Sequence, residues 1–306
     1  MKKTISVTIA IPAFNEQENI THILSCILES KLSKNIHSNI IVISDGSTDD
    51  TTKLVSNIAL IHKNVQLISH KKRLGKVNRL NEIYVQNSSD YLIVLDADIL
   101  PVGNHFIMDL INEMESNPSL TMCAAHQIPT KTKGLNAESI YAAYKVWDDA
   151  RLAVPDQNHI QNFYGAATIY RKKFVSHLHI PKMITDERGY IYLMAIREGR
   201  FKYSQSAVVL YNPVKTLHDL WKLGDRSFGK NQEILSNIFG SEVYDAYRIS
   251  IKYKLKSIFS NLVNNPIYTS IGLILNVLIR TFPVHDNLYN SGTWEPARST
   301  KHPIKI

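Results

Sequence analysis

The sequence lacks the residue patterns that several protein classes need. Its 306 residues include only two cysteines, Cys26 and Cys123, and no Cys-x-x-Cys pair, which argues against a zinc site or a redox motif. So few thiols suit a reducing compartment, and we expect a cytoplasmic protein. No run of 18 uncharged apolar residues is present, so no segment is expected to span a bilayer. The lysine-led start lacks a small-residue cleavage site, which disfavours secretion.

Motifs of several nucleotide-binding classes are also missing. Neither G-x-G-x-x-G nor G-x-x-x-x-G-K-[ST] occurs, which disfavours dinucleotide and P-loop enzymes. The charge balance of 35 basic and 27 acidic residues, +8, favours a polyanionic partner such as a phosphate group or an anionic membrane surface. No helix-turn-helix, zinc-finger or ribonucleoprotein pattern supports nucleic-acid binding. The 44% hydrophobic and 20% charged content is that of a globular chain with a core.

The first hundred residues alternate between predicted strands and helices. A capping pair, Asn15 with Glu18, predicts that the first helix opens there. The second helix is expected over about 48–61, and the third is expected to open at Gly75. Short apolar runs predict the strands 5–11, 40–43, 65–68 and 91–95. This order predicts an α/β fold with a mostly parallel sheet flanked by helices on both faces.

Polar and charged residues follow all four of these strands, at the edge where ligands of such sheets bind. Asp96 and Asp98 come directly after the fourth strand, and their carboxylates would suit Mg²⁺ or Mn²⁺ together with substrate phosphates. A solvated turn is the alternative explanation of this pair. Asp45 ends the second strand and offers a carboxylate to a base or ribose. Lys76 opens a predicted helix, where a phosphate would be stabilised, although a surface lysine is equally compatible with the pattern.

Four ordered segments carry a resemblance to a known family: IPAFNE, SDGSTDDTT, LGKVNRLN and VLDAD. Over about residues 6–230 the sequence resembles family 2 of the inverting nucleotide-sugar glycosyltransferases, which have the Rossmann-like GT-A fold. The resemblance implies a nucleotide-sugar donor, with UDP as the default nucleotide, and Mn²⁺ or Mg²⁺ as cofactor. It also implies roles for residues in the first half. Pro12, Glu16 and Asp45 would line the nucleoside pocket, Lys76 would face the diphosphate, Asp96 would touch the ribose side, and Asp98 beside it would bind the metal.

The second half carries weaker similarities to the family. Gly165 lies in a small-residue segment that in the family lies under the donor and acceptor sugars. Asp186 and Glu187 stand where the family has a Glu-Asp pair, in reversed order. Position in the resemblance implies that Glu187 is the general base, but the chemistry would accept either carboxylate, so both are candidates. An ion pair of this acidic pair with Arg188 or Arg197 is the structural alternative.

Further along, processive family members carry Gln-x-x-Arg-Trp. Only Arg226 is retained here, as a group that would neutralise diphosphate, so we expect transfer of one sugar or few rather than polymerisation. The expected activity is that of an inverting hexosyl- or N-acetylhexosaminyltransferase in glycan or cell-envelope polysaccharide biosynthesis, acting on a saccharide or lipid-linked acceptor. The competing hypothesis is a catalytically inactive partner that holds a nucleotide sugar.

The last part of the chain is expected to be helical rather than catalytic. We divide the chain into a catalytic domain, 1–235, and a C-terminal helical region, 236–306. Apolar residues recur at helical spacing over 247–262 among lysines and arginines, and a second apolar stretch covers 267–279. A basic amphipathic helix beside an apolar one suits peripheral binding to an anionic membrane surface. Packing on the catalytic domain and a homo-oligomer contact are the alternatives.

Overall fold

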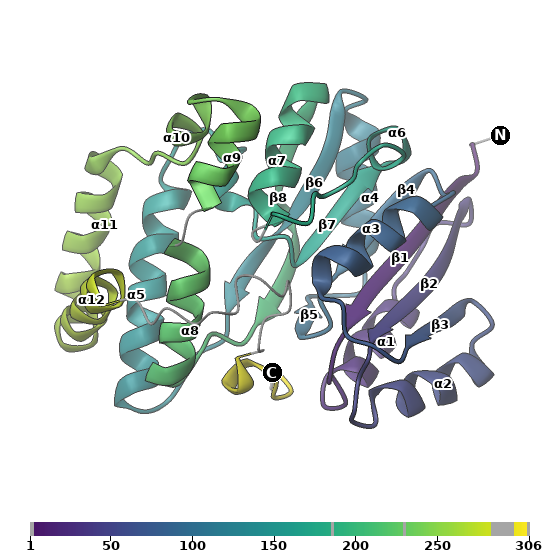
Figure 1. The fold of residues 1–306 in the computed structure, drawn as a ribbon, viewed down its shortest axis with the longest axis horizontal. Helices are drawn as coiled ribbons and strands as arrows, with labels where there is room; N and C mark the ends of the chain where they lie inside the picture. The colour runs from purple at the N-terminus through teal and green to yellow at the C-terminus, as the bar shows by residue number, and fades with distance from the viewer. Residues whose placement is uncertain (1–2, 185–186, 229–230, 283–296, 305–306) are drawn as a thin grey trace.

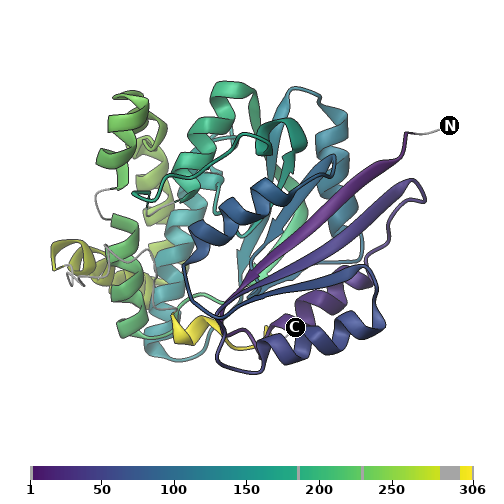
Figure 2. The ribbon, with the colours of Figure 1, turned by 45° about the vertical axis from the view of Figure 1, so that its right-hand side comes forward.

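A computed structural model describes residues 3–184, 187–228, 231–282 and 297–304, and gives the helix but not the side chains for 224–228. Within these ranges the centre of the molecule is one eight-stranded sheet in the order β3-β2-β1-β4-β7-β6-β8-β5. Helices cover both faces of the sheet, and a group of helices extends beyond its β8 side (Figures 1 and 2). The expected α/β fold with C-terminal helices is confirmed.

The elements alternate along the first half and become mainly helical along the second. The strands are β1 (Ile5–Ala13), β2 (Ile36–Asp45), β3 (Val65–His70), β4 (Tyr91–Leu95), β5 (Ile99–Pro101), β6 (Leu120–Pro129), β7 (Ala167–Arg171) and β8 (Arg200–Tyr211). The α-helices are α1 (Ile20–Leu28), α2 (Thr51–Ile61), α3 (Lys76–Gln86), α4 (Phe106–Ser116), α5 (Leu135–Leu152), α6 (Lys172–Val175), α7 (Glu187–Glu198), α8 (Leu217–Phe228), α9 (Asn231–Phe239), α10 (Glu242–Ala246), α11 (Ile251–Asn264) and α12 (Pro266–Thr281), with short 3₁₀ turns at Ile160–Asn162 and Arg298–Thr300.

The sheet is parallel on one side and mixed on the other. β1 pairs in parallel with both β2 and β4, so that Ile9 stands opposite Ile40 and Ile93. β7 runs antiparallel to β4 and β6, whereas β6 and β8 are parallel. The carboxyl ends of β1, β2 and β4 therefore meet at one edge, as the strand order predicted.

The core lies on both faces of the sheet. On one face, Ile9 and Ile11 belong to a buried cluster that includes residues of α1 and α4. On the other face, Ala10 and Ile43 pack in a cluster with residues of α3 and α7. Burying an aliphatic side chain of this size contributes about 1.5–3 kcal/mol, so these two clusters supply much of the hydrophobic stabilisation of the fold.

The first helix begins later than the sequence predicted. Asn15 does not open it: its backbone is left-handed, with φ of 52°, and α1 begins at Ile20 after Asn19. The side chain of Asn15 instead accepts a hydrogen bond from the Thr48 backbone N–H at 2.8 Å. The prediction failed because the polar side chain satisfies a distant loop rather than the nearest helix end.

The expected boundary at residue 235 lies inside α9. Leu235 and Phe239 of this helix are buried in the same cluster as α7, so α9 belongs to the core of the sheet domain. The division at 235 stays a prediction, and the outer helices α11 and α12 begin only at Ile251. Among the described residues, no helix is both long and apolar enough to cross a membrane.

Candidate active site

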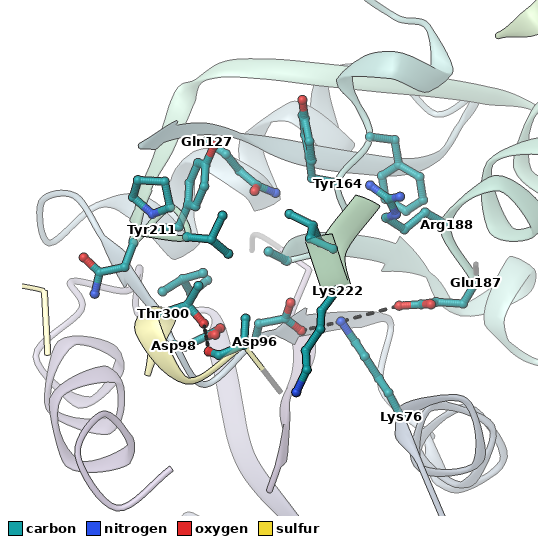
Figure 3. A pocket seen from close by; sticks show the side chains of 18 of the residues that line it. Lys76, Asp96, Asp98, Gln127, Tyr164, Glu187, Arg188, Tyr211, Lys222 and Thr300 are labelled. Atoms are coloured by element: carbon teal, nitrogen blue, oxygen red, sulfur yellow. Dashed lines mark hydrogen bonds and ion pairs between the residues drawn. The ribbon is translucent and has the colours of Figure 1, made fainter. Parts of the chain in front are cut away.

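A cavity of about 1230 Å³ lies at the carboxyl ends of β1, β2 and β4 (Figure 3). Among the described residues that line it, eight are lysine or arginine and five are aspartate or glutamate. This excess of positive charge favours an anionic ligand such as a diphosphate. The acidic residues gather at the sheet edge, as predicted from the strand ends.

Lys76 joins two of the predicted site residues. Its ammonium Nζ lies 2.6 Å from Oδ1 of Asp96 and 3.6 Å from Oε1 of Glu187 (Figure 3). Lys76 is the first residue of α3, Asp96 follows β4 and Glu187 is the first residue of α7, so three separate elements converge here. The Glu187 side chain is only 6% exposed, which keeps its carboxylate in a fixed place. Of the two arginines in the structural alternative, Arg197 pairs with Glu242 at 3.1 Å, and an ion pair with Arg188 stays an alternative.

Asp96 and Asp98 both line the cavity directly after β4. The backbone N–H of Asp96 donates to the Ala166 carbonyl at 2.7 Å, which ties this turn to the segment before β7. Burial and, to a smaller extent, the Asp96 carboxylate raise the pKa of Asp98 to about 6, and Lys76 opposes the shift. Two like charges in a half-buried turn are a place where a divalent cation would be stabilised.

The pair fits a metal that is held partly by its substrate. Among the described residues, no group of three or more His, Cys, Asp and Glu side chains could enclose an ion. Mg²⁺ and similar ions are commonly bound through one or two carboxylates plus substrate phosphates, so two aspartates suffice. The donor set is compatible with Mn²⁺ or Mg²⁺, and ligation by Asp96 and Asp98 stays a prediction.

Asp45 has a use that the sequence did not reveal. Its Oδ1 accepts hydrogen bonds from the Leu74 N–H at 2.9 Å and from Arg79 Nε at 2.7 Å, and its Oδ2 accepts one from the Gly75 N–H at 2.7 Å. Asp45 thereby fixes the loop that presents Lys76. It lines the cavity, as expected, but its predicted contact with a base must share a carboxylate that already holds this loop.

The nucleoside end predicted around Pro12 and Glu16 is covered by the far end of the chain. Pro12 and Glu16 both line the cavity, and Glu16 is buried. Lys301 contacts the Glu16 carboxylate through its ammonium group, and its carbonyl accepts a hydrogen bond from Asn19 Nδ2 at 2.8 Å. Ser299 is held in turn, because its N–H donates to Oδ2 of Asp219 at 2.9 Å.

The sequence placed this end in the C-terminal helical region, 236–306, with no expected role in the site. Thr300 and Lys301 are cavity residues that sequence reasoning missed. The contact between Glu16 and Lys301 joins residues 285 positions apart, so no local pattern could have indicated it. An isolated lysine near the C-terminus carries no periodic or spacing signal.

The structure describes the three remaining predicted site residues to different extents. Gly165 has φ of 74° and lies against Arg188, whose Cγ would be 3.1 Å from a side chain placed there. Its neighbours Tyr164 and Ala166 line the cavity, and a contact of Gly165 itself with the donor stays a prediction. Arg226 lies in α8, but its side chain lies outside the described residues, as does all of Asp186.

Aromatic side chains form another part of the cavity lining. They come from α5, the loop before β7, the end of β8 and the start of α8: Tyr144, Trp147, Tyr164, Tyr211 and Trp221. Figure 3 shows Tyr164, Tyr211 and Gln127 across the cavity from Asp96 and Lys76. The buried Arg151 guanidinium lies 4.9 Å from the centre of the Tyr164 ring and supports it from behind. Sequence reasoning missed this wall because its members are far apart in the chain.

Comparisons with known proteins bear on the family. The sequence pattern of Glycosyl transferase family 2 matches residues 8–178, more than half of the chain. The chain belongs to this family. It is 26% identical over 238 residues to the poly-beta-1,6-N-acetyl-D-glucosamine synthase of Staphylococcus aureus (strain COL), covering 77% of this chain and 57% of that protein. The chain thus spans little more than half the length of the curated relatives it matches.

Solved structures share the fold at lower identity. One is the mannosyltransferase PcManGT from Pyrobaculum calidifontis in complex with GDP-Man and Mn²⁺, with a TM-score of 0.57 and 16% identity over 88% of this chain and 73% of that one. Another is S. aureus TarS 1–349 in complex with UDP-GlcNAc, with a TM-score of 0.56 and 11% identity over 95% and 93% of the two chains. These likenesses confirm the GT-A fold expected from the four motifs.

Proposed function

We propose that the protein is an inverting, metal-dependent glycosyltransferase that moves one sugar from a UDP-sugar to a saccharide or lipid-linked acceptor. The observation that carries the proposal is the convergence of Lys76, Asp96 and Glu187 in one cavity. A cation for the leaving group and a carboxylate for the acceptor are the two groups that such a transfer needs within a few ångströms of each other.

Donor binding would use the side of the cavity at the sheet edge. The diphosphate would lie against Lys76, where the start of α3 adds its backbone N–H groups to the lysine charge. Lys76 would then stabilise the negative charge that grows on the departing nucleoside diphosphate. Asp96 and Asp98 would hold Mn²⁺ or Mg²⁺, which when bound supplies Lewis-acid stabilisation to the same diphosphate oxygens.

Acceptor activation is assigned to Glu187. Its carboxylate would take the proton from the acceptor hydroxyl as that oxygen forms its bond to the anomeric carbon. The bond from this carbon to the phosphate oxygen breaks on the opposite face, and the electron pair leaves with the diphosphate, which inverts the anomeric centre. The aromatic wall opposite Lys76 offers flat apolar surfaces on which sugar rings of a saccharide acceptor would pack.

The relatives support an N-acetylhexosamine donor. The curated relatives are named as synthases of an N-acetylglucosamine polymer, and the TarS structure contains UDP-GlcNAc, whereas PcManGT was solved with GDP-Man. We therefore propose a UDP-linked hexosamine over a GDP-linked sugar. The missing Gln and Trp around Arg226 favour addition of one sugar or few.

The test is release of nucleoside diphosphate by the purified full chain with Mn²⁺ and a set of nucleotide sugars. Glu187→Gln should lower kcat by about 10²–10⁴-fold, the range for loss of a general base, while donor binding measured by thermal shift persists. Glu198→Gln, at the other end of the same helix, is the matched control and should leave kcat unchanged. Asp186→Asn tests the neighbouring candidate in parallel.

The metal is tested separately. Asp98→Ala should abolish both turnover and Mn²⁺-dependent binding of the nucleotide, and EDTA should do the same to the wild type until Mn²⁺ is restored. Wild-type protein that binds a donor but never releases its diphosphate with any acceptor would favour the inactive binding partner. Full turnover in Glu187→Gln would refute the assignment of the base.

A further inference from the structure

The helices α11 and α12 form an outer layer on α5, at the edge of the molecule away from β3 (Figure 1). α11 meets α5 through small polar side chains rather than large apolar ones. Ser257 Oγ donates to the Val146 carbonyl at 2.6 Å, and Asn261 Nδ2 donates to Asp149 Oδ2 at 2.9 Å. Ser257 and Asn261 are buried. The contact of α11 with the protein is therefore a row of hydrogen bonds.

α12 also packs on α5, and its buried residues are Thr269, which bonds to α11, Gly272 and Ile279. Gly272 lies so close to α5 that a side chain there would be 2.3 Å from the Ser139 carbonyl oxygen. Thr269 is 1% exposed and its hydroxyl donates to the Asn261 carbonyl at 3.1 Å. Small residues thus let the two backbones approach, which is how helices pack when large side chains are needed elsewhere.

The opposite side of both helices is apolar and exposed. On α11 the exposed side chains recur every four residues and form one stripe: Ile251, Leu255, Phe259 and Val263, at 66, 58, 71 and 64% exposure. On α12 they are Ile267, Ile274 and Val277, at 67, 59 and 63%. We call these seven residues, with the exposed Lys252 and Lys256, the docking face. Monomeric soluble proteins rarely leave a contiguous apolar surface of this kind without a partner.

The positive charge around the docking face favours an anionic partner. Between residues 247 and 282 the sequence has five basic residues and no acidic one: Lys254 and Arg280, which line the cavity, and Arg248, Lys252 and Lys256. Lys252 and Lys256 are exposed beside the stripe of α11. The same face of a second copy would bring like charges together, which disfavours a dimer through it. An anionic lipid surface complements both the charge and the apolar stripe.

We propose that the docking face lies on an anionic lipid bilayer, with the axes of α11 and α12 in the plane of the interface. Helices of 14 and 16 residues are too short to cross but long enough to insert one apolar side. Lys254 and Asn276 of these helices also line the cavity, so docking would bring the acceptor side of the cavity to the lipid. Docking itself does not depend on the proposed transfer activity.

The experiment is co-sedimentation of the full chain with vesicles of phosphatidylcholine alone or mixed with phosphatidylserine. The wild type should sediment with the mixed vesicles and much less with phosphatidylcholine, and added salt should weaken binding. The double variant Leu255→Ser/Phe259→Ser should lose most of the binding to the mixed vesicles. Its matched control is Leu60→Ser/Ile61→Ser, which changes two apolar residues of α2 that are 84 and 78% exposed and should bind as the wild type does.

Charge variants keep the proposal testable if the serine variant fails to fold, as judged by circular dichroism. Lys252→Gln/Lys256→Gln should weaken binding about fivefold for each charge removed, whereas Lys53→Gln/Lys63→Gln on and beside α2 should not. Failure of the wild type to bind mixed vesicles would overturn the proposal. An equal loss of vesicle binding in the α11 variants and in the α2 control variants would also overturn it. A wild-type dimer that Leu255→Ser/Phe259→Ser converts to a monomer, without vesicle binding, would identify the face as a subunit interface instead.

Discussion

Replacing Asp45 with asparagine removes one charge and almost no volume from the loop that carries Lys76. The wild-type carboxylate accepts three hydrogen bonds, from the Leu74 and Gly75 N–H groups and from Arg79. Asp45 and Arg79 are 5 and 3% exposed, so water cannot replace a lost partner. An asparagine in either amide orientation turns its own N–H₂ group toward at least one of these donors.

The cost follows from this geometry. A buried donor left without an acceptor costs about 1–3 kcal/mol. Removing one partner of a buried ion pair costs about 3–5 kcal/mol. In Asp45→Asn, Arg79 still contacts Glu82 at 2.9 Å and the Lys72 carbonyl at 3.0 Å. We therefore expect a loss of unfolding free energy at the lower end of the ion-pair range, about 3 kcal/mol. This is a large share of the 5–15 kcal/mol by which domains are typically stable.

Urea unfolding of the wild type, Asp45→Asn, Arg79→Met and the double variant measures this cost and the coupling between the two side chains. The double variant should be less destabilised than the sum of the single changes, because it removes the charge that Asp45→Asn leaves behind. Asp50→Asn is the control, since Asp50 starts α2 without a side-chain cap, and should change stability little. An Asp45→Asn protein as stable as the wild type but weak in donor binding would refute the loop role and favour a contact with the base.

Two further predictions concern the same edge of the sheet and its opposite end. Gly46→Ala should destabilise the protein more than Gly103→Ala. Both positions have positive φ, but the new Cβ would lie 2.8 Å from the Arg73 backbone nitrogen at Gly46 and would meet nothing within 4 Å at Gly103. Equal unfolding midpoints of the two variants would contradict this prediction. At the opposite end, hydrogen bonds from the Ser6 N–H and then from its hydroxyl lower the pKa of Asp90. Its stabilisation should be complete above the ordinary aspartate pKa of about 4 and lost as the pH falls through the lower folded value. The stability gap between wild type and Asp90→Asn should therefore shrink in acid, and a gap of the same size at pH 7 and about pH 2 would contradict it.

The carboxylate edge of the site was predictable because it depends on local order. Asp45 ends β2, Asp96 and Asp98 follow β4, and Lys76 starts α3. Parallel strands bring their carboxyl ends to one edge whatever the details of packing. The approach of Glu187 to Lys76 was not predicted: the family resemblance implied a role for Glu187 by position, and only the structure shows that α7 begins at this edge.

The opposite side of the cavity could not be predicted in this way. The strands β6, β7 and β8 pair in an order that no short pattern specifies, and their pairing decides where Tyr211 and Tyr164 lie. Lys301 contacts Glu16 from a segment that Asp219 holds through Ser299 and Asn212 holds through His302. Such contacts depend on tertiary packing, and the sequence carries no separate signal for them.

The orientation of α11 shows how far periodicity alone can go. The apolar spacing correctly predicted a helix, because Ile251, Leu255 and Phe259 recur at intervals of four. The small polar residues Ser257 and Asn261 recur at the same interval on another side, so both stripes are equally regular. Periodicity fixes the angle between two stripes but not which of them meets the rest of the protein. In most surface helices the apolar stripe packs against the core. In α11 the polar stripe packs inward instead, because Asp149 and the Val146 carbonyl of α5 provide its hydrogen-bond partners. The apolar stripe therefore faces outward.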